Sequence, residues 1–362
     1  MLFAAAASAP TPLYVVYQKE WGFTATTLTV IFAVYVVALI ASLLVVGALS
    51  DHVGRRPVLA AAVTLEGAAF VLFLVAGGVT GLVVARATQG IATGMAFSTL
   101  GATLVDLNPP QSPGRAGLVN GVAPISGLAL GALGCGALVQ FAPAPTQLVF
   151  AVLLVATFLA SLVVALIPET SARRPGALAS LRPRLSVPSH LRPDVFALVP
   201  IIVASWALGG LYLSLGPSVA AGLFSLHNHL IGGLWPTSKV LGISALMLSA
   251  GTALTLVGVE TQMVLWAGVG TVIAGIGFGG SALASFGTLA RLAAPSERSE
   301  LLAVALVIAY LAFSVPAVAA GLATTSVGLH VTTVVYSIGV AALGAIAFAA
   351  QRRRARIIAR RP

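Results

Sequence analysis

Long apolar segments separated by short polar turns run along almost the whole chain. A helix that crosses a membrane needs about 20 mostly apolar residues. Eleven segments approach this pattern, near residues 2–17, 26–47, 57–77, 80–106, 116–140, 146–167, 196–222, 240–258, 263–290, 299–322 and 329–350. The pattern therefore predicts an all-α, polytopic membrane protein.

One long polar stretch, residues 168–194, interrupts this pattern and contains five prolines. We expect it to link two helix bundles of similar size. The predicted organisation is an N-terminal six-helix bundle at 1–167, a basic linker at 168–194, a C-terminal helix bundle at 195–351 and a basic tail at 352–362.

The arginines indicate how the chain is oriented in the membrane. Five of them lie in 173–192 and six in 352–361, and basic residues beside spans gather on the cytoplasmic side. The linker, the tail and both termini are therefore expected in the cytoplasm. The pattern gives five spans between the linker and the tail, and an odd number of crossings would put the two on opposite sides of the membrane. A twelfth crossing is therefore required, and residues 223–238 are the candidate. We expect a shortened or partly re-entrant eighth helix there.

The first predicted span begins directly after Met1, with no basic residue before it. A signal peptide carries a positively charged start. The segment is therefore interpreted as the first span, and a truncated beginning of that span is left open.

Composition also places the chain in a membrane. Its residues are 59% hydrophobic and 8% charged, whereas soluble globular proteins carry about 25% charged residues. So few charges cannot cover a water-facing surface. The formal net charge of +10 reflects arginines beside the spans, which favours contact with the lipid bilayer over binding to nucleic acid.

The most informative motif is the polar turn at 47–57, Gly-Ala-Leu-Ser-Asp-His-Val-Gly-Arg-Arg-Pro, between two apolar segments. A chain that leaves the membrane and re-enters at once needs a tight turn, which glycine permits. The arginines hold such a turn on the cytoplasmic face, and the aspartate gives them a partner. The residues concerned are Gly47, Asp51, Gly54, Arg55 and Arg56.

This turn resembles the loop between the second and third helices of major facilitator superfamily (MFS) transporters, whose pattern is G-x-L-x-D-x-x-G-R-[RK]. The resemblance implies two pseudo-symmetric six-helix bundles that rock about a central site, which opens to one side of the membrane at a time. It also implies that the aspartate lies at the start of the eleventh helix, and that the first arginine pairs with an acid ending the fourth. Asp51, Arg55 and Asp106 occupy these positions. Such contacts would latch the two halves together, and anchoring of the topology by charge alone is the alternative.

A second motif, Arg86-Ala-Thr-Gln89-Gly90, lies in the predicted fourth span and resembles the R-x-x-Q-G motif of the MFS fourth helix. The resemblance implies that Arg86 faces the central cavity and couples proton movement to substrate, with Gln89 in reach of substrate or of Arg86. An arginine inside the bilayer is costly unless it faces protein or water. Snorkelling of the Arg86 side chain to the outer surface is the other interpretation.

Glu66 lies near the middle of the predicted third span. A carboxyl group at that depth is either neutral or paired. Glu66 is a candidate to carry the exchanged proton, and the alternative is a structural partner for Arg86 or for a backbone group.

The predicted fifth span carries small residues at four-residue spacing around Pro124, Gly127 and Gly131. Such residues let membrane helices approach closely. The segment also partly resembles the glycine-proline motif of drug antiporters, although Ala123 stands where that family has glycine. Antiport and plain helix packing both remain open for this segment.

Other chemistries find no support in the sequence. The glycine-rich run at 275–280 follows no strand, so it is not a nucleotide-binding turn. His227 and His229 lack further ligands for a metal, and no ATP-binding G-x-x-x-x-G-K-[ST] motif is present. We therefore expect no metal, no cofactor and no enzymatic activity, and we infer no obligate protein partner.

The sequence thus predicts a secondary active transporter that moves a small organic solute by alternating access, with protons as the coupling ions and efflux as the favoured direction. Proton-coupled uptake is the first alternative. A degenerate protein that binds a partner or acts as a scaffold without transport is the second. The expected location is the plasma membrane, which in a bacterium is the inner membrane.

Overall fold

The computed structural model describes residues 1–108, 111, 115–171, 173–181, 187–214, 240–292 and 298–359. Within these ranges all regular structure is helical. Nine helices of the described part are long and apolar enough to cross a membrane, which confirms the predicted polytopic all-α class. The predicted eighth helix at 223–238 lies outside the described residues.

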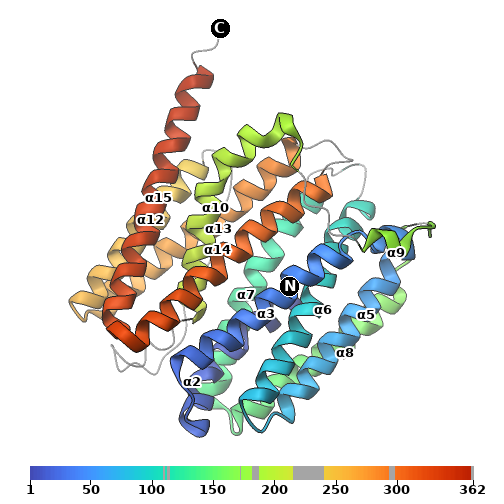
Figure 1. Cartoon of the computed structure of the whole chain (residues 1–362), viewed down its shortest axis with the longest axis horizontal. Helices are drawn as coiled ribbons and strands as arrows, with labels where there is room; N and C mark the ends of the chain where they lie inside the picture. The colour runs from blue at the N-terminus through green and yellow to red at the C-terminus, as the bar shows by residue number, and fades with distance from the viewer. Residues whose placement is uncertain are drawn as a thin grey trace. The chain divides into compact units, whose positions relative to one another are not determined.

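The helices fall into two compact units, Met1–Ser186 and Val187–Pro362. Figure 1 labels most of them along the chain. The first unit contains α1 (Leu2–Ser8), α2 (Pro10–Trp21), α3 (Ala25–Val46), α4 (Ser50–Val53), α5 (Arg55–Leu74), α6 (Val79–Asp106), α7 (Arg115–Phe141), α8 (Pro145–Leu166) and α9 (Ala177–Ser180). The second contains the short 3-10 helix η1 (Ser189–Leu191), α10 (Arg192–Ser214), α12 (Val240–Glu260), α13 (Val264–Leu292), α14 (Arg298–Val327) and α15 (Leu329–Ala359).

The first span is divided between α1 and α2, whereas the hydrophobic pattern predicts one continuous segment at 2–17. Ala9 keeps helical backbone angles between α1 and α2, so the chain continues in a similar direction to Trp21. Pro10 has no N–H and cannot bond back to the carbonyl of Ala6. That carbonyl is free for a partner outside the helix.

Close helix approach shapes the first unit, in which α6 packs against both α3 and α5, and α5 against α8 (Figure 1). A Cβ atom on Gly90 or Gly94 of α6 would collide with backbone oxygens of α3. Gly127 and Gly131 of α7 lie in the same way against α1, and Pro124 is inside α7. Small residues at these positions allow backbone-to-backbone contact between helices.

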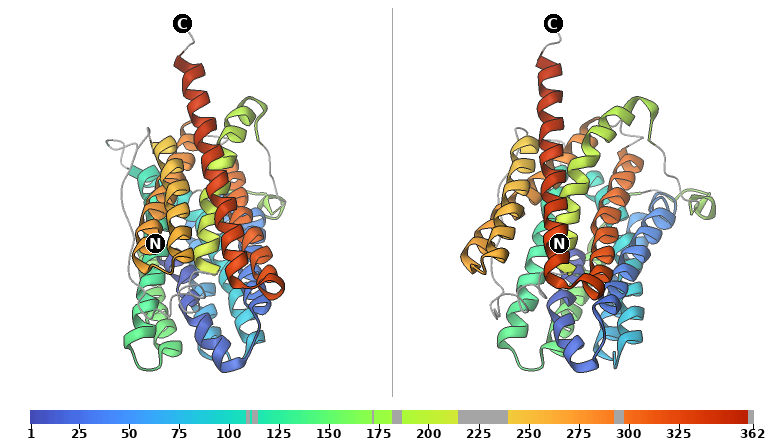
Figure 2. Two further views of the ribbon diagram at one scale, coloured as in Figure 1. Left: turned by 90° about the vertical axis from the view of Figure 1, so that its left-hand side faces the viewer. Right: turned by 60° about the vertical axis from the view of Figure 1, so that its left-hand side comes forward.

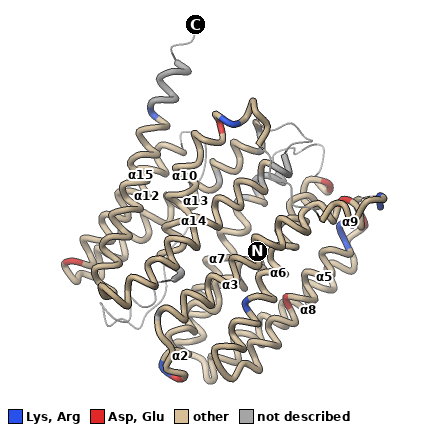
Figure 3. The backbone as a smooth tube through the Cα atoms, viewed as in Figure 1, with Lys and Arg blue, Asp and Glu red and all other residues tan. Residues whose placement is uncertain are grey.

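The second unit has its own buried core, in which α12 packs on α13 and α10 on α14 and α15. In Figure 2 the last helix, α15, continues beyond the neighbouring helices of its unit. Its final turns hold residues 352–359 of the predicted basic tail. Figure 3 shows that the charged residues of the described part gather at helix ends and turns, with few inside the first unit.

Candidate functional site

The turn between α3 and α5 brings Arg55 against two acids. Its guanidinium forms an ion pair with Asp51, four residues earlier in the chain, and its Nε lies 3.2 Å from Oδ2 of Asp106 at the end of α6. Its Nη1 also donates to the hydroxyl of Ser50 at 2.7 Å. Asp51, Arg55 and Asp106 thus meet in the first unit. Contact of Asp51 with the start of the eleventh helix, α14, stays a prediction.

Glu169 closes this turn, and it is the residue that the motif analysis missed. Its carboxylate accepts hydrogen bonds from the backbone N–H groups of Arg55 at 2.7 Å and Arg56 at 3.2 Å, the first two residues of α5. A third bond comes from the N–H of Ser171 at 3.1 Å. A carboxylate at a helix N-terminus satisfies N–H groups that have no partner inside the helix. The acid that directly follows Pro168 at the end of the sixth span was the available signal.

Gly54 is required in this turn for two reasons. Its φ of 109° lies in the region that side chains rarely adopt. A Cβ atom built on it would overlap the Glu169 carboxylate. The turn therefore uses Gly54 to let Glu169 reach the start of α5. Gly47, at the end of α3, has helical angles instead.

The segment after α8 binds the same turn at further points. Thr170 Oγ1 donates to Asp106 Oδ2 at 3.0 Å, and the N–H of Arg174 donates to the carbonyl of His52 at 2.9 Å. Arg56 reaches the carbonyl of Ala165 through Nη2 at 2.5 Å. We call these contacts among residues 50–56, 106, 165–171 and 173–175 the turn cluster.

The Glu169 carboxylate makes the turn cluster sensitive to acid. Partial desolvation alone would raise the pKa of Glu169, but the backbone donors of Ser171, Arg55, Arg56 and Thr170 outweigh it and hold this pKa below its ordinary value. A lowered folded-state pKa means that the carboxylate stabilises the fold above the unfolded pKa of about 4.3. The contribution is lost as pH falls through the folded-state pKa.

Glu169→Gln should therefore weaken protection of the α5 start. We expect the Arg55 and Arg56 amides to exchange hydrogen faster in the variant than in the wild type at pH 7. The two proteins should show equal protection once the pH falls below the folded-state pKa of Glu169. Peptide-resolved exchange mass spectrometry measures this. Exposed Glu20→Gln should change nothing, and equal protection at pH 7 in Glu169→Gln and wild type would contradict the capping role.

A second group of polar residues lies buried inside the first unit. The Arg86 side chain has no exposed surface, so it does not snorkel to the outer surface. Its Nε donates to Tyr14 Oη at 2.5 Å, and its Nη1 donates to the Ala7 carbonyl at 3.1 Å and to Gln89 Oε1 at 2.6 Å. The guanidinium also lies 4.9 Å from the centre of the Tyr35 ring, within range of a cation–π interaction.

Gln89 connects Arg86 to Glu66. Its Nε2 donates to Glu66 Oε1 at 3.2 Å and to the Ala6 carbonyl at 3.1 Å, the carbonyl that Pro10 leaves without a helical partner. Glu66 on α5 is fully buried. The two charged residues form no direct ion pair; they are bridged by an amide. The sequence motif places Arg86 and Gln89 one turn apart, and only the fold adds Glu66 and the α1 carbonyls.

Two polar atoms of this buried network have no hydrogen-bond partner among the described residues, Oε2 of Glu66 and Nη2 of Arg86. Buried polar groups are nearly always satisfied, and each exception calls for an explanation such as a proton, a water or a ligand. The network can therefore accept a proton at Glu66 and has donor capacity left at Arg86. Gly90, one residue beyond Gln89, lies against α3.

The second unit holds an aromatic cluster that sequence patterns did not reveal. The Trp206 ring of α10 lies 5.2 Å from Tyr310, 6.0 Å from Phe278, 6.1 Å from Phe313 and 6.4 Å from Phe286, centre to centre. Because these rings come from α10, α13 and α14, no local spacing predicts the cluster. Among the described residues no group of three His, Cys, Asp or Glu side chains could hold a metal ion.

Comparison with known proteins connects these observations. A family model described as Major Facilitator Superfamily matches residues 1–224. No curated protein sequence gives a match. Among solved structures, similar folds include a bacterial homologue of the human lysosomal transporter Spinster (TM-score 0.70, 12% identity, 97% of this chain and 95% of the other). One further example is a D-xylose-proton symporter, with a TM-score of 0.68, 15% identity and coverage of 95% of this chain and 94% of the other. Another is the human organic anion transporter, with a TM-score of 0.65, 16% identity and coverage of 96% of each chain.

Proposed function

The chain belongs to the Major Facilitator Superfamily of membrane transporters, and from this premise we propose that it exports a small organic solute in exchange for protons by alternating access. The observation that carries the proposal is the buried network of Arg86, Gln89 and Glu66. A proton-coupled transporter needs a group that binds and releases a proton inside the bilayer, and acids within membrane spans are rare and mark functional sites.

In this proposal Glu66 carries the proton. Its Oε2 has no hydrogen-bond partner among the described residues, and Oε1 has a single amide donor. Binding a proton removes the cost of holding a charge in that surrounding. Arg86 stays positively charged in either state. Protonation of Glu66 therefore alters the hydrogen bonds that Gln89 and Arg86 can make. Because both residues also bond carbonyls of α1, proton binding is coupled to the position of α1.

The turn cluster serves as a latch in the same proposal. Asp51, Arg55 and Asp106 form a charged node at the end of the first unit where α5 begins. The linker, the tail and the termini lie on the cytoplasmic side of the plasma membrane, in accord with the basic residues at 173–192 and 352–361. Opening and closing of this node would accompany the change in access.

Glu66→Gln should separate solute movement from proton movement. The amide keeps the size of the side chain but cannot release a proton, so solute added to proteoliposomes with a pH gradient should no longer change internal pH. Exchange of labelled for unlabelled solute should continue, because it needs no net proton transfer. A pH-sensitive dye and isotope counterflow measure the two, and exposed Glu20→Gln is the matched control.

Three outcomes would contradict the proposal. Unchanged solute-driven proton movement in Glu66→Gln would show that the proton is carried elsewhere. Solute binding without any flux in the wild-type chain would favour a binding or scaffold protein. Alkalinisation rather than acidification on the solute side, with coupling intact, would reverse the direction to uptake.

A further inference from the structure

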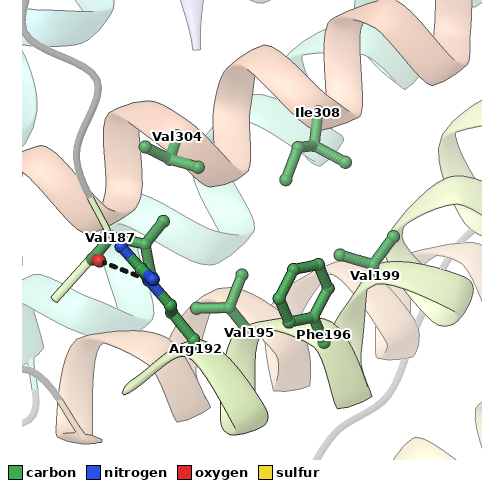
Figure 4. Close-up of a pocket in the computed structure, with 7 residues that line it drawn as sticks. All are labelled: Val187, Arg192, Val195, Phe196, Val199, Val304 and Ile308. Carbon is green, nitrogen blue, oxygen red and sulfur yellow. Dashed lines mark hydrogen bonds between the residues drawn. The ribbon is translucent and has the colours of Figure 1, made fainter. Parts of the chain in front are cut away.

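A cavity of about 320 Å³ lies in the second unit, between the beginning of α10 and the first third of α14 (Figure 4). Its walls are apolar, and they are formed by Val187, Val195, Phe196, Val199, Val304 and Ile308. One charged residue, Arg192, completes the lining. A predominantly apolar lining with a single well-placed charge is typical of a site for a small organic ligand.

Helix geometry explains why these residues meet. Positions 192, 195, 196 and 199 recur at three- and four-residue spacing, so they share one face of α10. Val304 and Ile308 share a face of α14 for the same reason. Figure 4 shows the two sets facing each other across the cavity. Phe196 leaves 71% of its surface exposed, so part of this wall is uncovered within the described residues.

The charge is at one end of the cavity. In Figure 4 Arg192 lies beside Val187, while Val199 and Ile308 form the opposite end. Arg192 Nε donates to the Val187 carbonyl at 3.3 Å, which orients the guanidinium. Within the described part of the chain this bond leaves the two terminal nitrogens with donor capacity. Asp194 is two residues further on, about 200° round the helix, and it does not line the cavity.

We propose that this cavity binds a small amphipathic organic anion, with its apolar body between α10 and α14 and its carboxylate or phosphate on Arg192. The inference rests on the proposed function, because it gives a chemical class to the transported solute. Guanidinium pairs such groups with two parallel hydrogen bonds. Arg192 is also the first residue of α10, where the helix dipole favours negative charge.

The size of the cavity selects among anions. Sites for drug-sized ligands enclose about 300–1,000 Å³, and this cavity lies at the lower end of that range. It suits a body of one or two rings. A phospholipid with two acyl chains exceeds it, and inorganic phosphate leaves the apolar walls unused. Only a small molecule that has both an apolar body and an anionic group can contact the apolar walls and Arg192 together.

The test uses the full chain in detergent and equilibrium dialysis with 1-naphthoate and its neutral isostere 1-naphthamide, each corrected for binding to empty micelles. We expect saturable binding of one naphthoate per chain, at least about tenfold tighter than naphthamide, from the charge-assisted pair. Arg192→Gln should reduce the affinity for naphthoate to the affinity for naphthamide. Ile308→Trp, which fills the far end, should weaken both ligands.

The control is Arg352→Gln. Arg352 is an exposed arginine of α15 whose guanidinium lies 4.6 Å from the centre of the Phe348 ring, and its loss should leave both ligands unchanged. Equal binding of naphthoate and naphthamide, or unchanged naphthoate binding in Arg192→Gln, would overturn the proposal. Displacement of naphthoate by nanodiscs containing phosphatidylglycerol but not by phosphatidylcholine discs would also overturn it, in favour of a lipid site.

These results are separable from those on transport. Arg192-dependent binding in a chain that shows no flux would keep this site while removing the proposed function. Proton-coupled flux of other solutes, with no Arg192-dependent binding of naphthoate, would keep the function and remove the site.

Discussion

Arg86→Met is expected to abolish solute-driven proton movement in proteoliposomes, with a loss of at least about 100-fold, or about 2.7 kcal/mol at 1.36 kcal/mol per factor of ten. The Arg86 guanidinium bonds Tyr14, the Ala7 carbonyl and Gln89 at once. Methionine fills similar volume but makes none of these bonds. Gln89 then loses the partner that sets its orientation toward Glu66.

Arg86→Met should also lower the thermal stability. It leaves the Tyr14 hydroxyl, the Ala7 carbonyl and Oε1 of Gln89 without their buried donor, and removing one partner of a buried charged group costs about 3–5 kcal/mol. Arg86→Lys should be inactive as well, because an ammonium group cannot donate along the three fixed directions that the guanidinium serves. Rates of dye-reported pH change and melting curves on the same samples test both points. A lysine variant with wild-type coupling would show that charge alone suffices.

Gly90→Ala is expected to lower the stability of the chain by several kcal/mol. A Cβ atom at this position would collide with the Tyr35 carbonyl of α3 and would lie 2.9 Å from Ala38 Cβ. Overpacking of this kind costs about 1–3 kcal/mol and more when the obstacle is backbone. The collision also displaces Tyr35, whose ring covers the Arg86 guanidinium.

Gly101→Ala on the same helix is the matched control. The nearest atom to its new methyl group would be Asn120 Nδ2 at 3.7 Å, an ordinary contact. Since alanine favours a helix over glycine by about 1 kcal/mol, this variant should melt at the same or a higher temperature. Cys135 is the single cysteine and is buried, so a thiol-reactive dye reports unfolding directly. Two variants with equal melting temperatures would contradict the close approach of α3 and α6.

The fold was predictable from the sequence because it depends on local composition. Segment lengths and turn residues predict a span at 57–77, and the structure has α5 at Arg55–Leu74. They predict another at 146–167, and the structure has α8 at Pro145–Leu166. The hydrophobic pattern does not predict the break at Pro10, because one proline hardly changes the hydrophobicity of an apolar segment. The proline changes only which backbone carbonyls lack a helical partner.

The candidate site was predictable where it lies on one helix or one turn. Arg86 and Gln89 are three residues apart on α6, so helix geometry brings them together. Asp51 and Arg55 lie on either side of Gly54 in one tight turn, and the turn brings these two side chains together. Glu66 joins the first pair from α5, and Glu169 joins the second from the segment that follows α8. Their partners depend on which faces pack against one another, and a single sequence does not contain that information.

The Glu169 contact sets an order of events during synthesis. Residue 169 leaves the ribosome after α5 has been made, yet it supplies the acceptor for the first amides of that helix, across 114 positions of the chain. A nascent chain that stops before α8 is complete would carry an α5 with an unfinished start. Maturation of this end of the first unit therefore waits for the segment that follows α8, and truncated translation products that lack it should be recognised there by quality-control proteases.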